Sequence, residues 1–185
     1  MVGMASTEEA FARLGRWVLG HASEAALPPL EMTRRLLLDW HAHRSGAPRP
    51  RRPCQVGHSL LGVDPDGNVM PCHRFLYRPQ DWFGTVERPE LQTERRRPFV
   101  ELDSDRMAAC RDCEAEPVCG GGCRLVALQQ GAGLDEPHPG HCIPMRAHTR
   151  MVARVYQALL DRGTLGTVLR SSRQSARPRA SFILN

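Results

Sequence analysis

Two segments before residue 50 carry apolar residues at the spacing of an amphipathic helix. One covers residues 6–20 and the other roughly residues 28–43, where Pro28 and Pro29 suit the first helical turn. The apolar faces consist of Phe11, Leu14, Val18 and Leu19 in the first segment and Met32, Leu36, Leu37 and Trp40 in the second. Residues 45–53 (SGAPRPRRP) are rich in proline and end the helical pattern. We therefore expect two helices followed by an extended linker.

The pattern changes to short strands after this linker. Residues 60–63 and 69–70 are apolar, and they flank DPDGN at residues 64–68, whose Pro, Asp and Gly favour a tight turn. Gly67 is expected to supply a positive φ there. Residues 82–86 (WFGTV) form another short extended piece. These features predict a β-hairpin with irregular structure after it, and a helix near residues 89–97.

A further helix is predicted over residues 145–160. Residues 163–185 are rich in Gly, Ser and Arg, which is typical of a mobile tail. The inward face of the helix is expected to consist of Met151, Val152, Val155, Tyr156 and Leu159.

The order of these segments predicts a small, loop-rich α+β fold, in which a β-hairpin and cysteine-rich loops are flanked by helices. We expect three parts along the chain. Residues 1–53 form a helical lead-in with a Pro/Arg linker, residues 54–160 form the cysteine-rich domain, and residues 161–185 form a flexible tail.

The charge and the apolar content of the chain indicate which kinds of partner it does not bind. The chain of 185 residues has a net charge of +5, and all 25 of its basic residues are arginine. The arginines are spread along the chain without interleaved aromatic residues, so we do not expect a nucleic-acid partner. No apolar run approaches the length of a membrane span, and the first residues lack the pattern of a secretory signal. We expect a cytoplasmic protein without a membrane partner.

Seven cysteines carry the candidate chemistry. Their spacing is C-x12-G-x4-C, then C-x2-C-x5-C-x3-C, then a last cysteine. Several thiols on short loops can converge on one soft metal centre without a long loop being closed for each. A reducing compartment and an odd number of cysteines also favour metal over disulfides. The residues are Cys54, Cys72, Cys110, Cys113, Cys119, Cys123 and Cys142.

Two kinds of metal centre are compatible with this spacing. Cys110 and Cys113 are spaced like one zinc knuckle, but the other offsets do not pair into a second one. The triple glycine at residues 120–122 lies between two cysteines, where it lets the backbone pack closely around a bulky inorganic core. The spacing thus favours iron–sulfur clusters, with a structural zinc module as the alternative.

The motifs LGVDPDGNVMPCHRF, WFGTV and CRDCEAEPVCGGGCR, with their spacing, resemble the SPASM domain. This is the C-terminal auxiliary-cluster domain of many radical S-adenosylmethionine (radical SAM) enzymes that modify peptides, and the resemblance covers residues 54–142. It implies two [4Fe–4S] clusters. The first would be held by Cys54, Cys72 and Cys123, and the second by Cys110, Cys113, Cys119 and Cys142.

The resemblance leaves one coordination position of the first cluster open, because residues 55–71 lack the eighth cysteine that some members have. His58, Asp64 and His73 are the candidates by sequence, besides water or substrate. Sulfatase-maturing members carry an aspartate, a proposed base, at the position of His73. Here His73 is a candidate for proton transfer or for a hydrogen bond to cluster sulfur.

The chain lacks the C-x3-C-x2-C motif that binds the catalytic cluster of a radical SAM enzyme. We therefore expect that it does not cleave S-adenosylmethionine alone. It would be an auxiliary domain or subunit that positions a peptide or protein substrate and relays electrons, with a radical SAM catalytic domain as partner and a ferredoxin or flavodoxin as reductant. The alternative is a free-standing electron carrier. In either case the metal-free form should be largely disordered between residues 54 and 142.

Overall fold

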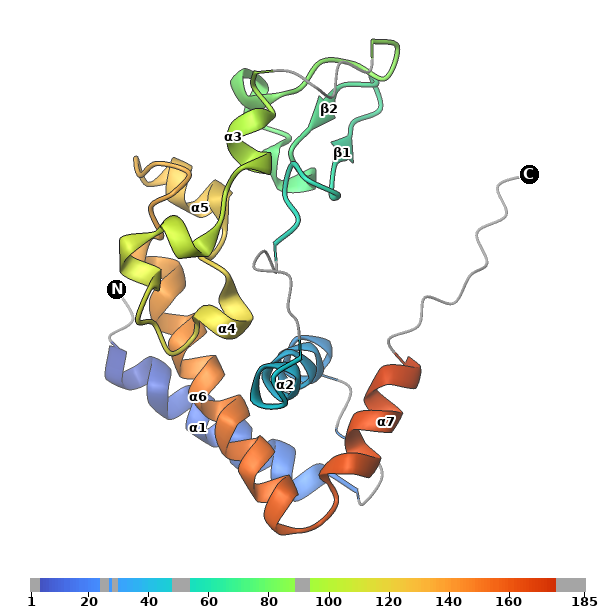
Figure 1. The fold of residues 1–185 in the computed structure, drawn as a ribbon, viewed down its shortest axis with the longest axis vertical. Helices are drawn as coiled ribbons and strands as arrows, with labels where there is room; N and C mark the ends of the chain where they lie inside the picture. The colour runs from blue at the N-terminus through green and yellow to red at the C-terminus, as the bar shows by residue number, and fades with distance from the viewer. Residues whose placement is uncertain (1–3, 24–26, 28–29, 48–53, 89–93, 176–185) are drawn as a thin grey trace, which may run out of the picture. The chain divides into compact units, whose positions relative to one another are not determined.

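The chain folds as two units in the computed structural model, which describes residues 4–23, 27, 30–47, 54–88 and 94–175 (Figure 1). The first unit combines residues 1–49 with residues 146–185, and the second unit comprises residues 50–145. This division differs from the expected domain at 54–160, because residues 146–160 belong with the N-terminal helices.

The first unit is helical, as the apolar stripes predicted. Its elements are α1 (Met4–His21), α2 (Glu31–Arg44), the part of α6 (Pro139–Asp161) from residue 146 onward, and α7 (Leu165–Ser175). Gly15 of α1 lies against Met151 and Val155 of α6, where the missing side chain allows close approach. The buried residues are Val18, Leu36, Leu37, Met151, Val152, Val155, Leu159, Leu165, Val168 and Leu169.

Two expectations about these helices need correction. Met32 was placed on the buried face of α2, but it is 60% exposed, and the buried polar residue Thr33 lies beside Leu36 and Leu37 instead. A flexible tail was expected from residue 161, but residues 165–175 form α7. Leu165, Val168 and Leu169 recur at helical spacing and are buried, so α7 packs although Gly, Ser and Arg surround these apolar positions. Residues 176–185, like Pro28 and Pro29, lie outside the described residues.

Buried polar contacts also connect α2 to α6. The Thr33 hydroxyl lies 3.1 Å from His148 Nε2 in a buried hydrogen bond, and the His41 ring lies 3.1 Å from the Tyr156 hydroxyl. Phe11 of α1 stacks on the His148 ring at a centroid distance of 4.8 Å. His148 is therefore a point of contact among three helices of this unit.

The second unit begins with the predicted hairpin. Strands β1 (Gly62–Val63) and β2 (Val69–Met70) are antiparallel, with Gly62 opposite Met70. In the turn between them, the Asp64 carboxylate accepts hydrogen bonds from the backbone N–H groups of Asp66 and Asn68, and Gly67 has a φ of 80° as expected. The backbone of Phe83 donates to the Val69 carbonyl at 2.7 Å, so the extended piece expected at 82–86 lies alongside β2.

An aromatic cluster forms the core of this unit. Phe99 contacts the rings of Phe75 and Phe83 edge-on, at centroid distances of 5.7 and 5.5 Å. Val56, Val69, Met70, Cys72 and Leu125 complete the buried cluster.

The rest of the second unit consists of loops and short helices. These helices are η1 (His73–Phe75), η2 (Pro79–Asp81), α3 (Arg97–Val100), η3 (Ser104–Arg106), η4 (Ala108–Cys110), α4 (Glu116–Cys119) and α5 (Arg124–Gln129). The helix expected near 89–97 falls largely on residues 89–93, which are not described, and α3 begins at Arg97. None of the helices described here is long and apolar enough to cross a bilayer.

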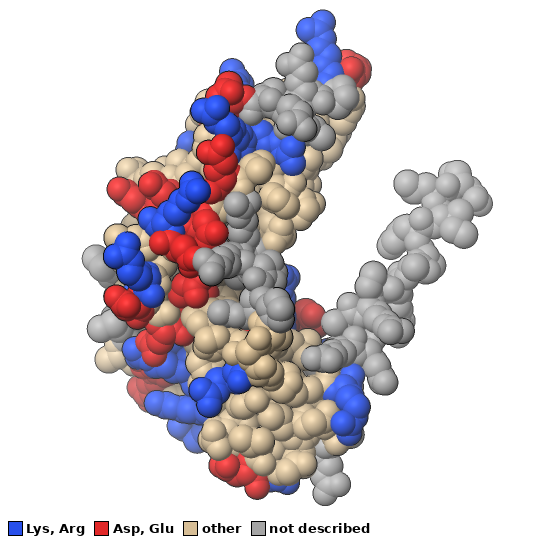
Figure 2. Space-filling model, in the orientation of Figure 1, with Lys and Arg blue, Asp and Glu red and all other residues tan. Residues whose placement is uncertain are grey.

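Charged side chains of both signs alternate on the face shown in Figure 2. Several arginines pair with acidic residues one helical turn away, as Arg34 does with Glu31 and Arg97 with Glu94. Such surface pairs contribute little to stability. They place positive charge next to carboxylates, in line with the scattered arginines of the sequence.

His148 makes the stability of the first unit sensitive to acid. Burial lowers the pKa of His148 below its usual value of 6.5, so below that pH the unfolded chain binds a proton that the folded chain does not. The free energy of unfolding should therefore fall as the pH drops from about 6.5, the usual histidine pKa, toward the lowered pKa. Denaturant titration by circular dichroism at pH 7.5 and 5.5 would measure this loss, and His148→Gln should reduce it. An equal loss in both proteins would contradict this role.

Candidate metal centre

The hairpin gathers a first set of thiols. The backbone N–H of Gly57 donates to the Pro71 carbonyl at 2.9 Å, which holds the chain after Cys54 next to the residue before Cys72. Cys72 is buried in the aromatic core, and Cys123 packs against the same core. Burial raises the pKa of the Cys72 thiol, and negative charge on Cys54 and Cys123 raises it further, while backbone N–H groups partly oppose the shift. Cys54 and Cys123 therefore both lie within electrostatic reach of Cys72.

Successive tight turns gather a second set. The backbone N–H of Cys110 donates to the Met107 carbonyl, that of Cys113 to the Cys110 carbonyl, and that of Glu116 to the Cys113 carbonyl. These three bonds form consecutive turns. Burial raises the pKa of Cys110, and negative charge on Cys113 and Cys142 raises it further.

The fourth thiol of this second set is the most strongly shifted. Burial raises the pKa of Cys119 to about 11, and Cys142, Cys110 and Cys113 also raise it. Negative charge on Cys110, Cys113 and Cys142 thus acts on Cys119, and negative charge on Cys54 and Cys123 acts on Cys72, so the thiols interact as a set of four and a set of three. Which metal these sets hold stays a prediction.

The raised pKa values of these thiols bear on whether they could act as metal ligands. A thiol with a raised pKa stays protonated at neutral pH, while a metal ligand must be a thiolate. A metal cluster, when bound, would supply the positive charge that makes several neighbouring thiolates stable. Among the described residues, no group of three or more His, Cys, Asp or Glu side chains converges closely enough to hold a single metal ion.

The glycine run between the two sets has an unusual backbone. Gly120, Gly121 and Gly122 have φ values of 57°, 89° and 82°, a conformation that other residues rarely adopt. A Cβ atom on Gly121 would collide with the Arg124 guanidinium and Met107 Sδ, and one on Gly122 would lie 2.8 Å from Cδ2 of His141. The glycines therefore make room for Arg124, Met107 and His141 beside the thiols.

Three basic residues near the thiols were not predicted. Arg74 Nη1 donates to Cys123 Sγ at 3.0 Å, His141 Nε2 lies 3.9 Å from Cys119 Sγ, and Arg124 is only 3% exposed. Burial lowers the pKa of His141, and the charges of Arg124 and Arg74 lower it further, so its ring is neutral at neutral pH. The sequence holds a signal for two of them, since Arg124 follows Cys123 and His141 precedes Cys142.

The candidates for the open position of the first cluster have different environments. The Asp64 carboxylate accepts hydrogen bonds within the hairpin turn, and those from Asn68 lower its pKa. His58 is exposed, and its backbone carbonyl accepts a hydrogen bond from Arg96 at 2.8 Å. His73 is exposed in η1, directly after Cys72. The structure gives Asp64 a role in the turn and leaves the two histidine side chains accessible.

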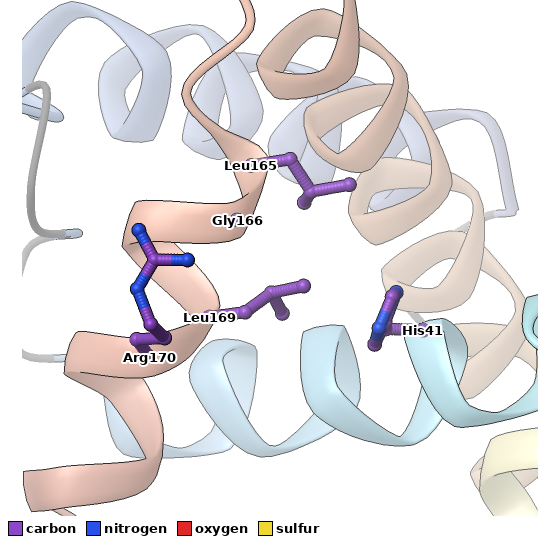
Figure 3. A pocket seen from close by; sticks show the side chains of 5 residues that line it. All are labelled: His41, Leu165, Gly166, Leu169 and Arg170. Atoms are coloured by element: carbon purple, nitrogen blue, oxygen red, sulfur yellow. The ribbon is translucent and has the colours of Figure 1, made fainter.

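The first unit contains a pocket between α2 and α7 (Figure 3). Leu165 and Leu169 project from α7 on the side where His41 of α2 lies, and Arg170 projects away from them. Arg170 donates a hydrogen bond to Thr167 Oγ1 on its own helix. The lining is thus mostly apolar and does not gather polar groups, so the thiol sets are the stronger candidate site.

Comparisons with protein-family models, with curated proteins and with solved structures found no match to this chain. The resemblance to the SPASM domain therefore rests on the sequence motifs alone. The structure adds the grouping of the thiols and the residues between them.

Replacing Gly122 should test how closely the loop packs on His141. Gly122→Ala introduces a Cβ at a positive φ and against the His141 ring, whereas Gly131→Ala introduces one at a φ of 78° with nothing within 4 Å. Both should lose about 1–2 kcal/mol from the backbone conformation, and Gly122→Ala should lose about 1–3 kcal/mol more from crowding. Denaturant unfolding of the metal-loaded protein would measure the difference. Equal losses would mean that His141 simply moves aside.

Proposed function

We propose that this chain holds two [4Fe–4S] clusters and serves as the auxiliary domain of a radical SAM system that matures a peptide or protein. The observation that supports the proposal is the interaction of Cys72 with Cys54 and Cys123, and of Cys110 and Cys119 with each other and with Cys113 and Cys142. The resemblance to the SPASM domain implies the same two sets of ligands.

The two sets suit clusters of different character. Cys110, Cys113, Cys119 and Cys142 would supply four thiolates, the full ligation of a [4Fe–4S] cluster. Cys54, Cys72 and Cys123 would supply three and leave one position for a side chain, water or substrate. Such clusters, when bound, carry single electrons at potentials that depend on charge, hydrogen bonds and exposure.

The chain's own residues have defined tasks in this proposal. Arg74 donates a hydrogen bond to Cys123 Sγ, and the His141 ring lies beside Cys119 Sγ, so both polarise ligand sulfurs. The aromatic core around Phe75 shields Cys72 from water. Cys54 is exposed, which leaves one side of the three-thiol set accessible to a partner.

The catalytic step belongs to a partner in this proposal, because these 185 residues contain no C-x3-C-x2-C motif. The partner would be a radical SAM domain or subunit, and a ferredoxin or flavodoxin would supply electrons in the cytoplasm. His73 is a candidate for proton transfer at the three-thiol set. If no such partner acts with the chain, the same clusters would make it a free-standing electron carrier.

Metal content tests the two sets directly. After anaerobic reconstitution, two intact clusters correspond to about eight irons and eight sulfides per chain. Cys119→Ala and Cys123→Ala alter cysteines only a few residues apart, yet each should lose about half of the iron, from a different cluster. Chemical analysis and electron paramagnetic resonance of the reduced proteins would show two different residual signals. A colourless zinc protein, or the same residual signal in both variants, would refute the proposal.

The dependence on a catalytic partner is tested with S-adenosylmethionine and dithionite. The reconstituted chain alone should release no 5′-deoxyadenosine, because no thiol triplet of the catalytic type is present. Liquid chromatography would detect the product, and a radical SAM enzyme with its own C-x3-C-x2-C motif would be the positive control. Product from this chain alone would overturn the assignment of catalysis to a partner.

A further inference from the structure

Arg124 is a buried cation at the start of α5. It is 3% exposed, and arginine is rarely buried to this extent unless its charge is compensated. In the described part of the chain, no carboxylate lies within ion-pair distance of its guanidinium. Its compensation must therefore come from another source.

The Arg124 guanidinium donates hydrogen bonds to backbone carbonyl groups, which are neutral and do not compensate its charge. Nη1 donates to the Leu134 carbonyl at 2.8 Å, and Nη2 donates to the Gly120 carbonyl at 3.1 Å. Nη1 also lies 3.4 Å from Met107 Sδ, and that sulfur lies 4.0 Å from Cys110 Sγ. The guanidinium is thus held on the four-thiol side through Met107, and its own residue directly follows Cys123 of the three-thiol set.

The charges that act on Arg124 come from both sets. Burial lowers its pKa, and negative charge on Cys54, Cys110, Cys119 and Cys123 opposes that shift. Cys54 and Cys123 belong to the three-thiol set, while Cys110 and Cys119 belong to the four-thiol set. Gly121 is needed at this place, because a Cβ atom there would run into the guanidinium. The loop therefore makes room for a positive charge on the residue that follows Cys123, in contact with Met107, whose sulfur lies 4.0 Å from Cys110 Sγ.

We propose that Arg124 is a counter-ion shared by both clusters, and that its buried guanidinium raises the reduction potentials of both. This inference rests on the proposed function. A cluster becomes more negative when it accepts an electron, so a nearby cation stabilises the reduced state. The interaction is stronger in a buried site than at the surface, because water screens it less. Arg124 acts through the clusters and is a positioning residue, not a catalytic one.

The experiment compares midpoint potentials in the full-length, reconstituted protein. Dithionite supplies the electrons, and electron paramagnetic resonance follows each cluster. The variants are Arg124→Gln, which removes the charge, and Arg124→Lys, which keeps it. Arg111→Gln is the matched control, because it removes an exposed arginine from the same cysteine run.

Arg124→Gln should lower both potentials, so that at a fixed potential the ratio of reduced to oxidised cluster falls at least tenfold, or about 59 mV. Arg124→Lys should shift both less, and Arg111→Gln should shift neither by this amount. If Arg124→Gln fails to hold iron, the charge-keeping Arg124→Lys should still hold both clusters.

Three results would overturn the inference. They are unchanged potentials in Arg124→Gln, a shift confined to one cluster, and loss of iron from Arg124→Lys equal to that from Arg124→Gln. In each of these the wild-type protein still carries two clusters, so the proposed function would stand. A wild-type chain without iron–sulfur clusters would overturn the proposed function and this inference together.

Discussion

Burial and the negative charge of neighbouring sulfurs raise the pKa values of Cys72, Cys110 and Cys119, and this crowding of thiols is the constraint on which the second unit depends. The unit has one small aromatic core and a two-stranded hairpin, and loops and short helices make up the rest. Such loops bury little apolar surface to offset the entropy of ordering them. A centre that binds thiolates from several loops at once would supply that missing cohesion.

Much of the fold could be predicted because its signals are local. Helical spacing of apolar residues located α1, α2 and α6, and the Asp64–Gly67 turn located the hairpin. The signal for α7 was hidden, because Leu165, Val168 and Leu169 stand among glycines, serines and arginines that dominate the composition. Periodicity was the better guide there, since burial depends on which positions share a face and not on their average polarity.

The candidate site also has parts that the sequence predicted and parts that it did not. The spacing of the cysteines predicted a metal centre, and the resemblance to the SPASM domain supplied their division into two sets, which stays a prediction. The contacts of Arg124 with Leu134 and Met107 join segments that no pattern in the sequence connects. The same holds for His141 beside Cys119. Such contacts depend on how loops cross, which is fixed by tertiary packing.

The left-handed run Gly120–Gly122 also has an evolutionary consequence. It is the whole span between Cys119 of one set and Cys123 of the other, so an insertion or deletion there changes the reach of both sets at once. Most surface loops tolerate changes of length during divergence. A change of length in this run would displace Cys119 and Cys123 relative to each other, so we expect it to tolerate fewer insertions and deletions than other loops of the chain.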